Sequence, residues 1–192
     1  MMEDISEIIN QLGIDRRIRL EDIPSIDLYM DQVTQLFENT YRPSKRRDEE
    51  KVLTKTMINN YAKGKLLFPI QNKKYSREHI MLIQLIYQLK GGLSINDVRI
   101  VLANLNDKME KSDIELDPIY QHYSDLQDRQ VEVFHVAVQS LYQDVQSELA
   151  DMQGEHGGYL EQLLLVTALI QQSNMYRRLA EQIVDQMGER HV

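Results

Sequence analysis

The stretch that decides the fold covers residues 42–77 and reads RPSKRRDEEKVLTKTMINNYAKGKLLFPIQNKKYSR. It contains eleven Lys or Arg residues and three Asp or Glu residues, although the whole chain of 192 residues has a formal net charge of −8 at pH 7. Residues 103–192 have the opposite character, with six basic and sixteen acidic side chains. A local charge of +8 in an acidic chain predicts that this segment binds an anionic partner.

Local signals within the stretch indicate its secondary structure. Thr54 is a favourable N-cap and Gly64 a favourable stop for a helix between them. Residues 66–75 place an apolar run and a proline before a polar turn, a pattern typical of a small two-stranded wing. Residues 79–89 then form a helical segment that is apolar on nearly all sides. We expect that helix to be buried.

Amphipathic patterns continue on both sides of the basic stretch. They predict a short helix over about residues 5–12 and a second helix over about residues 27–41. Ser94 begins a further helix, because an acidic residue follows it three positions later. From about residue 107 the sequence becomes acidic and Gln-rich, with apolar residues three or four apart. A reversal of this long helix is indicated by Gly154, Gly157 and Gly158.

The predicted fold class is all-α, or mainly helical. We expect residues 1–106 to form one helical domain that has a small wing and an N-terminal helix. Residues 107–192 should form a long helical hairpin that serves dimerisation or effector binding. The absence of Cys excludes disulfides and suits a reducing compartment. With neither a secretory signal nor the roughly 20 apolar residues of a membrane span, we expect a cytoplasmic protein.

Three short motifs resemble the DNA-binding module of the MerR-type transcription regulators. They are INNY at residues 58–61, LLFP at residues 66–69 and KYS at residues 74–76. Residues from about 23 to 102 are also similar to a bacterial family known only as domain of unknown function 1836. The resemblance implies that the domain of residues 1–106 has a winged helix-turn-helix fold and binds duplex DNA, and it supplies no effector. The similarity to the second family is clearest in residues 27–32 and 54–61.

The chain departs from the MerR-type pattern in three respects. The arginine that those regulators usually carry two residues before the tyrosine is Asn59 here. The glycine expected before the paired leucines is Lys65, with Gly64 one position early. The charged connection before Thr54 is longer than a helix-turn-helix turn of about three to four residues.

Side-chain chemistry identifies candidate DNA contacts. Asn side chains pair bidentately with adenine in the major groove, and Lys side chains reach phosphates or guanine edges. We predict base readout by Asn59, Asn60 and Lys63, the alternative being that one of the two Asn residues caps or packs locally. We expect Tyr61 and Tyr75 to pack the wing onto the helices rather than to stack on bases. The predicted DNA-binding residues are Lys55, Asn59, Asn60, Lys63, Lys65, Lys73, Lys74 and Arg77, of which the last three are assigned to phosphates.

No catalytic pattern is found in the sequence. The five histidines show no spacing typical of metal ligands. A Gly-rich phosphate loop, a serine elbow and a zinc helix motif are all missing. We therefore predict no enzyme activity, no metal and no cofactor.

Two other interpretations share the same charge pattern. A helical adaptor would bind an acidic partner protein through the basic segment and would use the hairpin as a second docking surface. A ligand sensor would hold a small molecule among aromatic side chains of the hairpin, although such a stripe is more often simply core. The partners that we predict are double-stranded DNA and a second copy of the chain. The aromatic residues in question are Tyr120, Tyr123, Phe134, Tyr142 and Tyr159.

Overall fold

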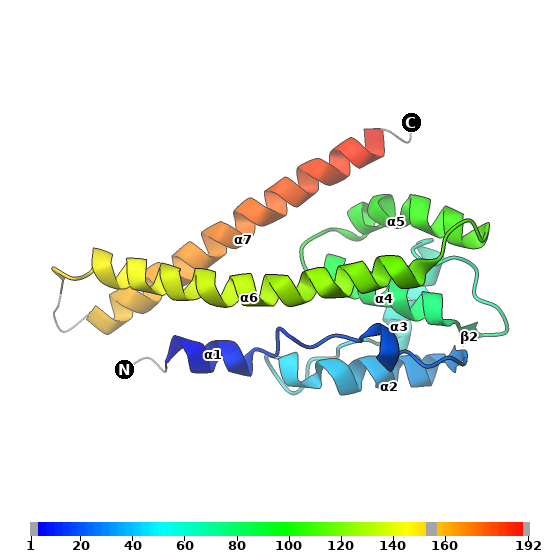
Figure 1. Ribbon diagram of the computed structural model, residues 1–192, viewed down its shortest axis with the longest axis horizontal. Coiled ribbons are helices and arrows are strands. Elements are labelled where there is room, and N and C mark those ends of the chain that lie inside the picture. The colour runs from blue at the N-terminus through cyan, green and yellow to red at the C-terminus, as the bar shows by residue number, and fades with distance from the viewer. Residues whose placement is uncertain (1–3, 153–156, 190–192) are drawn as a thin grey trace.

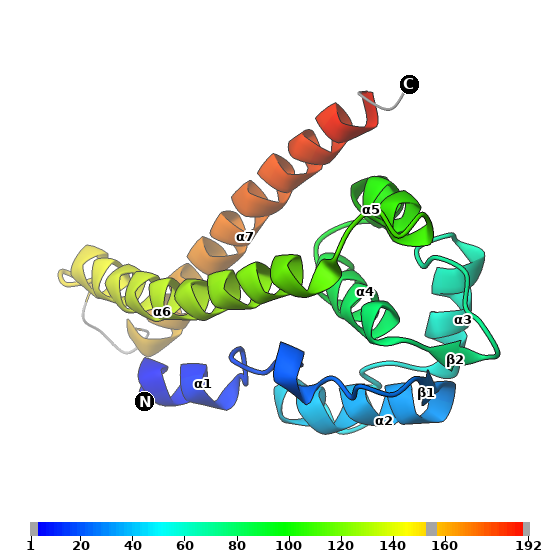
Figure 2. The same cartoon turned by 45° about the vertical axis from the view of Figure 1, so that its right-hand side comes forward.

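The computed structural model describes residues 4–152 and 157–189. In this range the chain is mainly helical with one two-stranded sheet, which confirms the predicted fold class. Helices α2 to α5 and the sheet form a core domain, and the two long helices α6 and α7 extend from it (Figure 1). Figure 2 shows that α3 and β2 lie at the end of the molecule opposite to the C-terminal end of α6.

The N-terminal helix α1 (Ile5–Gln11) packs against α6 rather than against the core domain. The Asp4 carboxylate caps α1 by accepting a hydrogen bond from the Ser6 amide at 2.9 Å. Gly13 ends this segment with a φ of +60°, a conformation that favours glycine. A short 3-10 helix (Leu20–Asp22) follows. The predicted helix over residues 5–12 is therefore confirmed.

The second predicted helix begins later than expected. Leu28 and Tyr29 form strand β1, and α2 runs from Met30 to Tyr41. The side chain of Gln32 accepts a hydrogen bond from the Tyr29 amide at 2.9 Å, which fixes the helix start after the strand. A short 3-10 turn (Arg42–Ser44) ends the helix.

The helices α3, α4 and α5 confirm their sequence predictions. Helix α3 (Lys55–Lys63) starts at Thr54, whose hydroxyl accepts a hydrogen bond from the Met57 amide at 3.1 Å. Helix α4 (Arg77–Leu89) is the central element of the core domain. Helix α5 (Ile95–Glu110) begins with the predicted pairing of Ser94 and Asp97. The buried residues of α4 are His79, Ile80, Met81, Leu82, Ile83, Gln84 and Ile86.

The predicted wing is wrong in its strand pairing. Strand β2 (Lys74–Tyr75) pairs antiparallel with β1, so that Leu28 faces Tyr75. Within residues 66–75, the strand pairing that the structure describes is a single isolated bridge between Gln71 and Lys74. The physical reason is that the consecutive residues Leu66 and Leu67 are both buried, whereas a strand with one solvated face alternates.

The predicted domain boundary between residues 106 and 107 falls inside α5. The chain leaves this helix at Lys111, and Ser112 takes a φ of +57° before α6 (Leu116–Glu148) begins. The first turns of α6 belong to the core domain, because Leu116 and Tyr120 are buried in its hydrophobic cluster. Helix α6 thus belongs to the core domain at its start, although all of it lies in the predicted region 107–192.

Helix α7 (Gly157–Glu189) forms an open rather than a closed hairpin with α6. The two helices touch where the Tyr142 hydroxyl donates to the Glu161 carboxylate at 2.8 Å. They then diverge (Figure 1), and the far end of α7 contacts α5, where Gly188 lies beside Ile100. The predicted reversal at Gly154 lies outside the described residues.

Two polar contacts attach α6 to the segment before α2. The buried Tyr120 hydroxyl donates a hydrogen bond to the Ile18 carbonyl at 2.6 Å. The side chain of Arg17 is buried and forms an ion pair with Asp128, about two turns further along α6. Burial raises the pKa of the Tyr120 phenol, so the hydroxyl stays protonated and available as a donor.

We predict that Tyr120→Phe lowers the free energy of unfolding by about 1–3 kcal/mol, because the buried Ile18 carbonyl loses its partner. Urea unfolding followed by circular dichroism measures this change. Tyr159→Phe is the matched control, because the Tyr159 side chain is largely exposed. Equal stabilities for the two variants would contradict the proposed anchoring role.

Candidate nucleic-acid interface

Helix α3 separates buried apolar residues from an outward polar face. Ile58 and Tyr61 are buried in the core cluster, which confirms that Tyr61 is a packing residue. Side chains three or four positions apart lie on one face of a helix, so Ile58 and Tyr61 share the buried face. The opposite face carries cations and amides together. The exposed residues of this face are Lys55, Thr56, Asn59, Asn60 and Lys63.

The turn before β2 presents a second polar group at the same end of the molecule. Asn72 and Lys73 have φ angles of +51° and +59°, and the Lys74 amide donates to the Gln71 carbonyl at 2.9 Å. Positive φ at both central residues is the requirement of a type I′ turn, for which Asn-Gly is the preferred pair. Here Lys73 occupies the glycine position, so an exposed cation stands where a side chain is unfavourable. Tyr75, directly after this turn, is buried in the core cluster as predicted.

A similar arrangement ends α3. Lys65 has a φ of +57°, and the Leu66 amide donates to the Tyr61 carbonyl at 2.9 Å, as in the common helix C-terminal motif that favours glycine. Gly64, one position earlier, has a negative φ of −77°. An exposed Lys therefore takes the left-handed conformation, at a cost of about 1–2 kcal/mol.

His79 contacts the segment between α3 and α4 at two positions, one on each side of the turn at Asn72-Lys73. Its Nδ1 lies 3.2 Å from the Ser76 amide, and its Nε2 lies 3.2 Å from the Phe68 carbonyl. An amide only donates, so Nδ1 is the acceptor and the proton is on Nε2. The imidazole also stacks on the Phe68 ring, with 3.8 Å between the ring centroids. One neutral side chain therefore joins the backbone before the turn at Lys73 to the backbone after it.

The electrostatic character of this end of the molecule is strongly positive. Residues 54–77 contain six Lys or Arg and no Asp or Glu. In the described chain, Lys63, Lys65 and Lys73 make no ion pair. Lys55 pairs with Asp31 of α2, but both side chains are exposed, so the pair is weak. The Lys74 ammonium lies 5.3 Å from the centre of the Tyr29 ring, in a cation–π contact.

Arg77 points inward, which argues against its predicted role as a phosphate contact. Its guanidinium donates to the Ile23 carbonyl at 2.8 Å and to the Leu20 carbonyl at 2.9 Å. It also pairs with Asp117 at the start of α6, at 3.3 Å. These contacts join α4, α6 and the segment before β1, so the prediction is corrected to a structural role.

The basic run divides into two separate parts in space. Lys45 and Lys51 lie in a loop beside the C-terminal end of α4, where they line one hollow with Tyr87 and Gln88. The three carboxylates of the basic stretch are in this loop, and Lys45 pairs with Glu38. The purely cationic part is therefore α3 with the turn that follows it.

Two exposed residues of this surface were not predicted from the sequence. Thr56 lies on the outward face of α3 between the predicted residues, and Asn72 lies at the tip of the turn. The helical period could have identified Thr56, because it precedes Asn60 by one turn. Asn72 gave a weaker signal for an exposed turn: Asn tolerates positive φ, but the Lys73 that follows it is not a typical turn residue.

Comparison with known protein families identifies one match. Residues 18–123, more than half of the chain, match the family described as Domain of unknown function (DUF1836). The chain belongs to this family. No curated protein and no solved structure matches the chain.

The DUF1836 region coincides with a structural unit. It begins at Ile18, whose carbonyl accepts the Tyr120 hydrogen bond. It ends at Tyr123, in the part of α6 that packs on the core cluster. The rest of α6 and all of α7 lie outside the match, so the family region is the core domain together with the root of the long helix.

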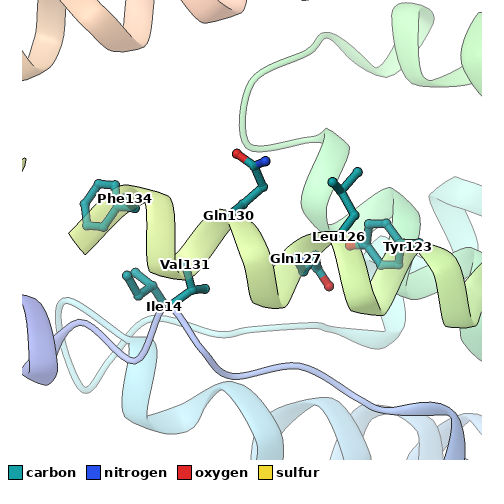
Figure 3. A pocket seen from close by; sticks show the side chains of 7 residues that line it. All are labelled: Ile14, Tyr123, Leu126, Gln127, Gln130, Val131 and Phe134. Carbon is teal, nitrogen blue, oxygen red and sulfur yellow. The ribbon is translucent and has the colours of Figure 1, made fainter. Parts of the chain in front are cut away.

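The aromatic residues considered for a ligand sensor do not gather at one site in this DUF1836 protein. Tyr120 is core, Tyr142 binds Glu161, and Tyr159 is exposed. Tyr123 and Phe134 do line a shallow hollow of about 310 Å³ on α6, where Ile14 reaches the helix beside Val131 (Figure 3). The other residues that line it are Leu126, Gln127 and Gln130.

The part of the DUF1836 protein that the structure describes contains no group of three or more His, Asp or Glu side chains that could hold a metal ion. None of the described helices combines the length and the apolar character needed to cross a membrane.

The buried His79 leads to a pH prediction. Burial lowers the pKa of its imidazole below the ordinary value of 6.5, against the smaller opposing effect of the Phe68 carbonyl. The unfolded chain then binds the proton more readily, so this contribution to stability is complete above about pH 6.5 and is lost as the pH falls through the folded pKa. For one group the slope stays below about 1.4 kcal/mol per pH unit.

We predict that His79→Asn makes the free energy of unfolding less dependent on pH between about 5 and 7 than it is in the parent protein. Urea unfolding at a series of pH values measures the difference. His122→Asn is the control, because His122 is exposed on α6. A parent-like pH dependence in the His79 variant would contradict the assignment.

Proposed function

We propose that this protein is a DNA-binding transcriptional regulator of MerR-like type that acts as a homodimer. In this proposal α3 is the recognition helix, and the turn at Asn72-Lys73 takes the place of the wing tip. The observation that carries it is the cationic surface of residues 54–77, which has amides between its cations and a rigid apolar core behind it.

The dimensions of α3 suit the major groove. A helix is about 10–12 Å across with its side chains, and the groove is about 12 Å wide. Asn59 and Asn60 lie at the centre of the outward face, where a docked helix would present them to base edges. Lys63, Lys65 and Lys73 surround them and would meet phosphates.

A homodimer fits the small size of this surface. One recognition helix reads few base pairs, and regulators of this kind gain affinity and half-site spacing by pairing two copies. The long helices α6 and α7 lie away from the cationic end, so pairing through them would leave both α3 helices free (Figure 2).

We predict that the purified protein binds duplex DNA with a strong dependence on salt. If about four to six phosphates are neutralised per copy, log affinity falls against log salt concentration with a slope of about −4 to −5. Fluorescence anisotropy with a pool of random duplexes at several salt concentrations measures this slope. Absence of binding at low salt would refute the proposal, and binding to an acidic protein in preference to duplex DNA would favour an adaptor.

We predict that Lys73→Gly changes stability and DNA affinity in opposite directions. The substitution creates the preferred Asn-Gly turn and relieves the left-handed Lys, so the free energy of unfolding should rise by about 0.5–1 kcal/mol. Loss of the cation should weaken binding to all duplexes nearly equally and should make the salt slope less steep by about 1. Urea unfolding and anisotropy measure the two effects.

Asn59→Ala is the informative comparison for that variant. It removes a candidate base contact without changing charge, so its loss of about 1–3 kcal/mol should be confined to preferred sequences. Lys73→Arg keeps the cation and should retain the parent affinity. Equal losses on preferred and scrambled duplexes for Asn59→Ala would contradict base readout by α3.

A further inference from the structure

Unpaired polar atoms are concentrated at one place in this protein. Six buried side-chain nitrogen or oxygen atoms of the described residues have no hydrogen-bond partner. Buried polar atoms are nearly always paired, because an unpaired atom has lost its hydrogen bonds to water without a replacement. Departures from this rule are expected at functional sites. Four of the six atoms belong to the side chains of Arg17, Gln84, Tyr123 and Gln127.

These four side chains meet between α4, α6 and the segment before α2. Tyr123 and Gln127 are about one turn apart on α6 and lie on the same side of it. Arg17 pairs with Asp128, the residue after Gln127. Burial raises the pKa of the Tyr123 phenol to about 12, against the smaller opposing effects of Gln84 and the Arg17 cation, so both groups lie near its hydroxyl. The unpaired atoms therefore form one buried polar cluster.

The hollow on α6 lies beside this polar cluster, because Tyr123 and Gln127 also line it. Among the described residues, those that line the hollow carry no charge, although 27% of the chain is charged. Its volume of about 310 Å³ is at the lower end of the range for small-molecule sites, roughly 300–1,000 Å³. Its apolar walls, drawn in Figure 3, consist of Ile14, Leu126, Val131 and Phe134.

We propose that this hollow binds a neutral small molecule that has an apolar body and one carboxamide group. The Tyr123 hydroxyl offers a donor, and Oε1 of Gln127 offers an acceptor. A carboxamide has the complementary pair, so its carbonyl accepts from Tyr123 while its N–H donates to Gln127. The apolar body contacts Val131 and Phe134 on the same helix.

Rotation of the two side chains brings their polar atoms to the hollow. The unpaired atoms are covered, yet Tyr123 and Gln127 are half-buried residues whose other atoms already line the hollow. Changes of side-chain rotamer are common when proteins bind a partner. The bound carboxamide then supplies two missing hydrogen bonds, which an apolar ligand cannot do.

A charged ligand is disfavoured at this place. An ion that enters the hollow loses its hydration, and the residues described there provide no opposite charge to replace it. The nearby Arg17 cation is already paired with Asp128. The site goes beyond the proposed regulator, because it lies on α6 and its chemistry does not involve the cationic surface of α3.

Benzamide is a probe of the right class, since it joins an aromatic ring to one carboxamide. We expect its titration into the full-length protein to cause saturable changes in the backbone amide NMR signals of the residues that line the hollow. The affinity should be on the order of millimolar, as is usual for so small a ligand. Benzoate is the charged isostere, and acetophenone keeps the carbonyl but lacks the N–H. Each should bind about tenfold more weakly than benzamide.

Binding of benzoate or acetophenone as tightly as benzamide would overturn the carboxamide assignment. Absence of saturable changes with benzamide, or changes confined to other parts of the chain, would overturn the site itself.

Tyr123→Phe gives a result that a purely structural tyrosine would not give. The substitution removes an unpaired buried hydroxyl, so the urea midpoint of unfolding should rise while benzamide binds about tenfold more weakly. Gln127→Leu should weaken benzamide binding for the same reason. Gln143→Leu is the matched control and should keep the parent affinity, because Gln143 is an exposed glutamine of α6 outside the hollow.

Parent-like benzamide binding by Tyr123→Phe would refute the proposal, and so would a lower urea midpoint, since the hydroxyl would then be paired inside the protein. Neither experiment uses DNA. A protein that binds benzamide but no duplex DNA refutes the regulator and leaves this site standing, and the reverse result refutes the site alone.

Discussion

Burial of α4 on nearly all sides is the constraint on which the rest of the structure depends. The helix carries two polar side chains, His79 and Gln84, into the apolar core, where each requires a hydrogen-bond partner. Gln84 donates to the Tyr41 hydroxyl at the end of α2, and His79 joins the segment that follows α3. The positions of α2 and of the cationic surface are therefore fixed by the same helix.

The helices were predictable because their signals are local. Helices such as α3 and α5 are each marked by a cap, at Thr54 or Ser94, and by apolar residues three or four positions apart that lie within a few turns of that cap. Neighbouring residues in the sequence were therefore enough to predict each of these helices. The pairing of β1 with β2 was not predictable, since two-residue strands that are distant in sequence have no periodic pattern. The divergence of α7 from α6 was missed for a similar reason, because it depends on a distant contact with α5.

The candidate site was predictable to a similar extent. The helical period placed Asn59, Asn60 and Lys63 on one face, and the structure leaves that face exposed. The inward position of Arg77 was missed, because its partners are the backbone carbonyls of Leu20 and Ile23, and carbonyls have no signature in a sequence. The left-handed backbone at Lys65 and Lys73 was equally hidden, since glycine is the residue that usually reports it.

The shared helix α6 has a mechanical consequence. Its 33 residues form a rod on the order of 50 Å long, rooted in the core domain by Tyr120 and Arg17. Because about 42 Å separate Tyr120 from the end of α6 at Glu148, a tilt of about 10° at Tyr120 would move that end by roughly 7 Å. The rod has the geometry of a lever arm, because a small change of tilt at the Ile18 carbonyl corresponds to a displacement several times larger at the other end of the helix.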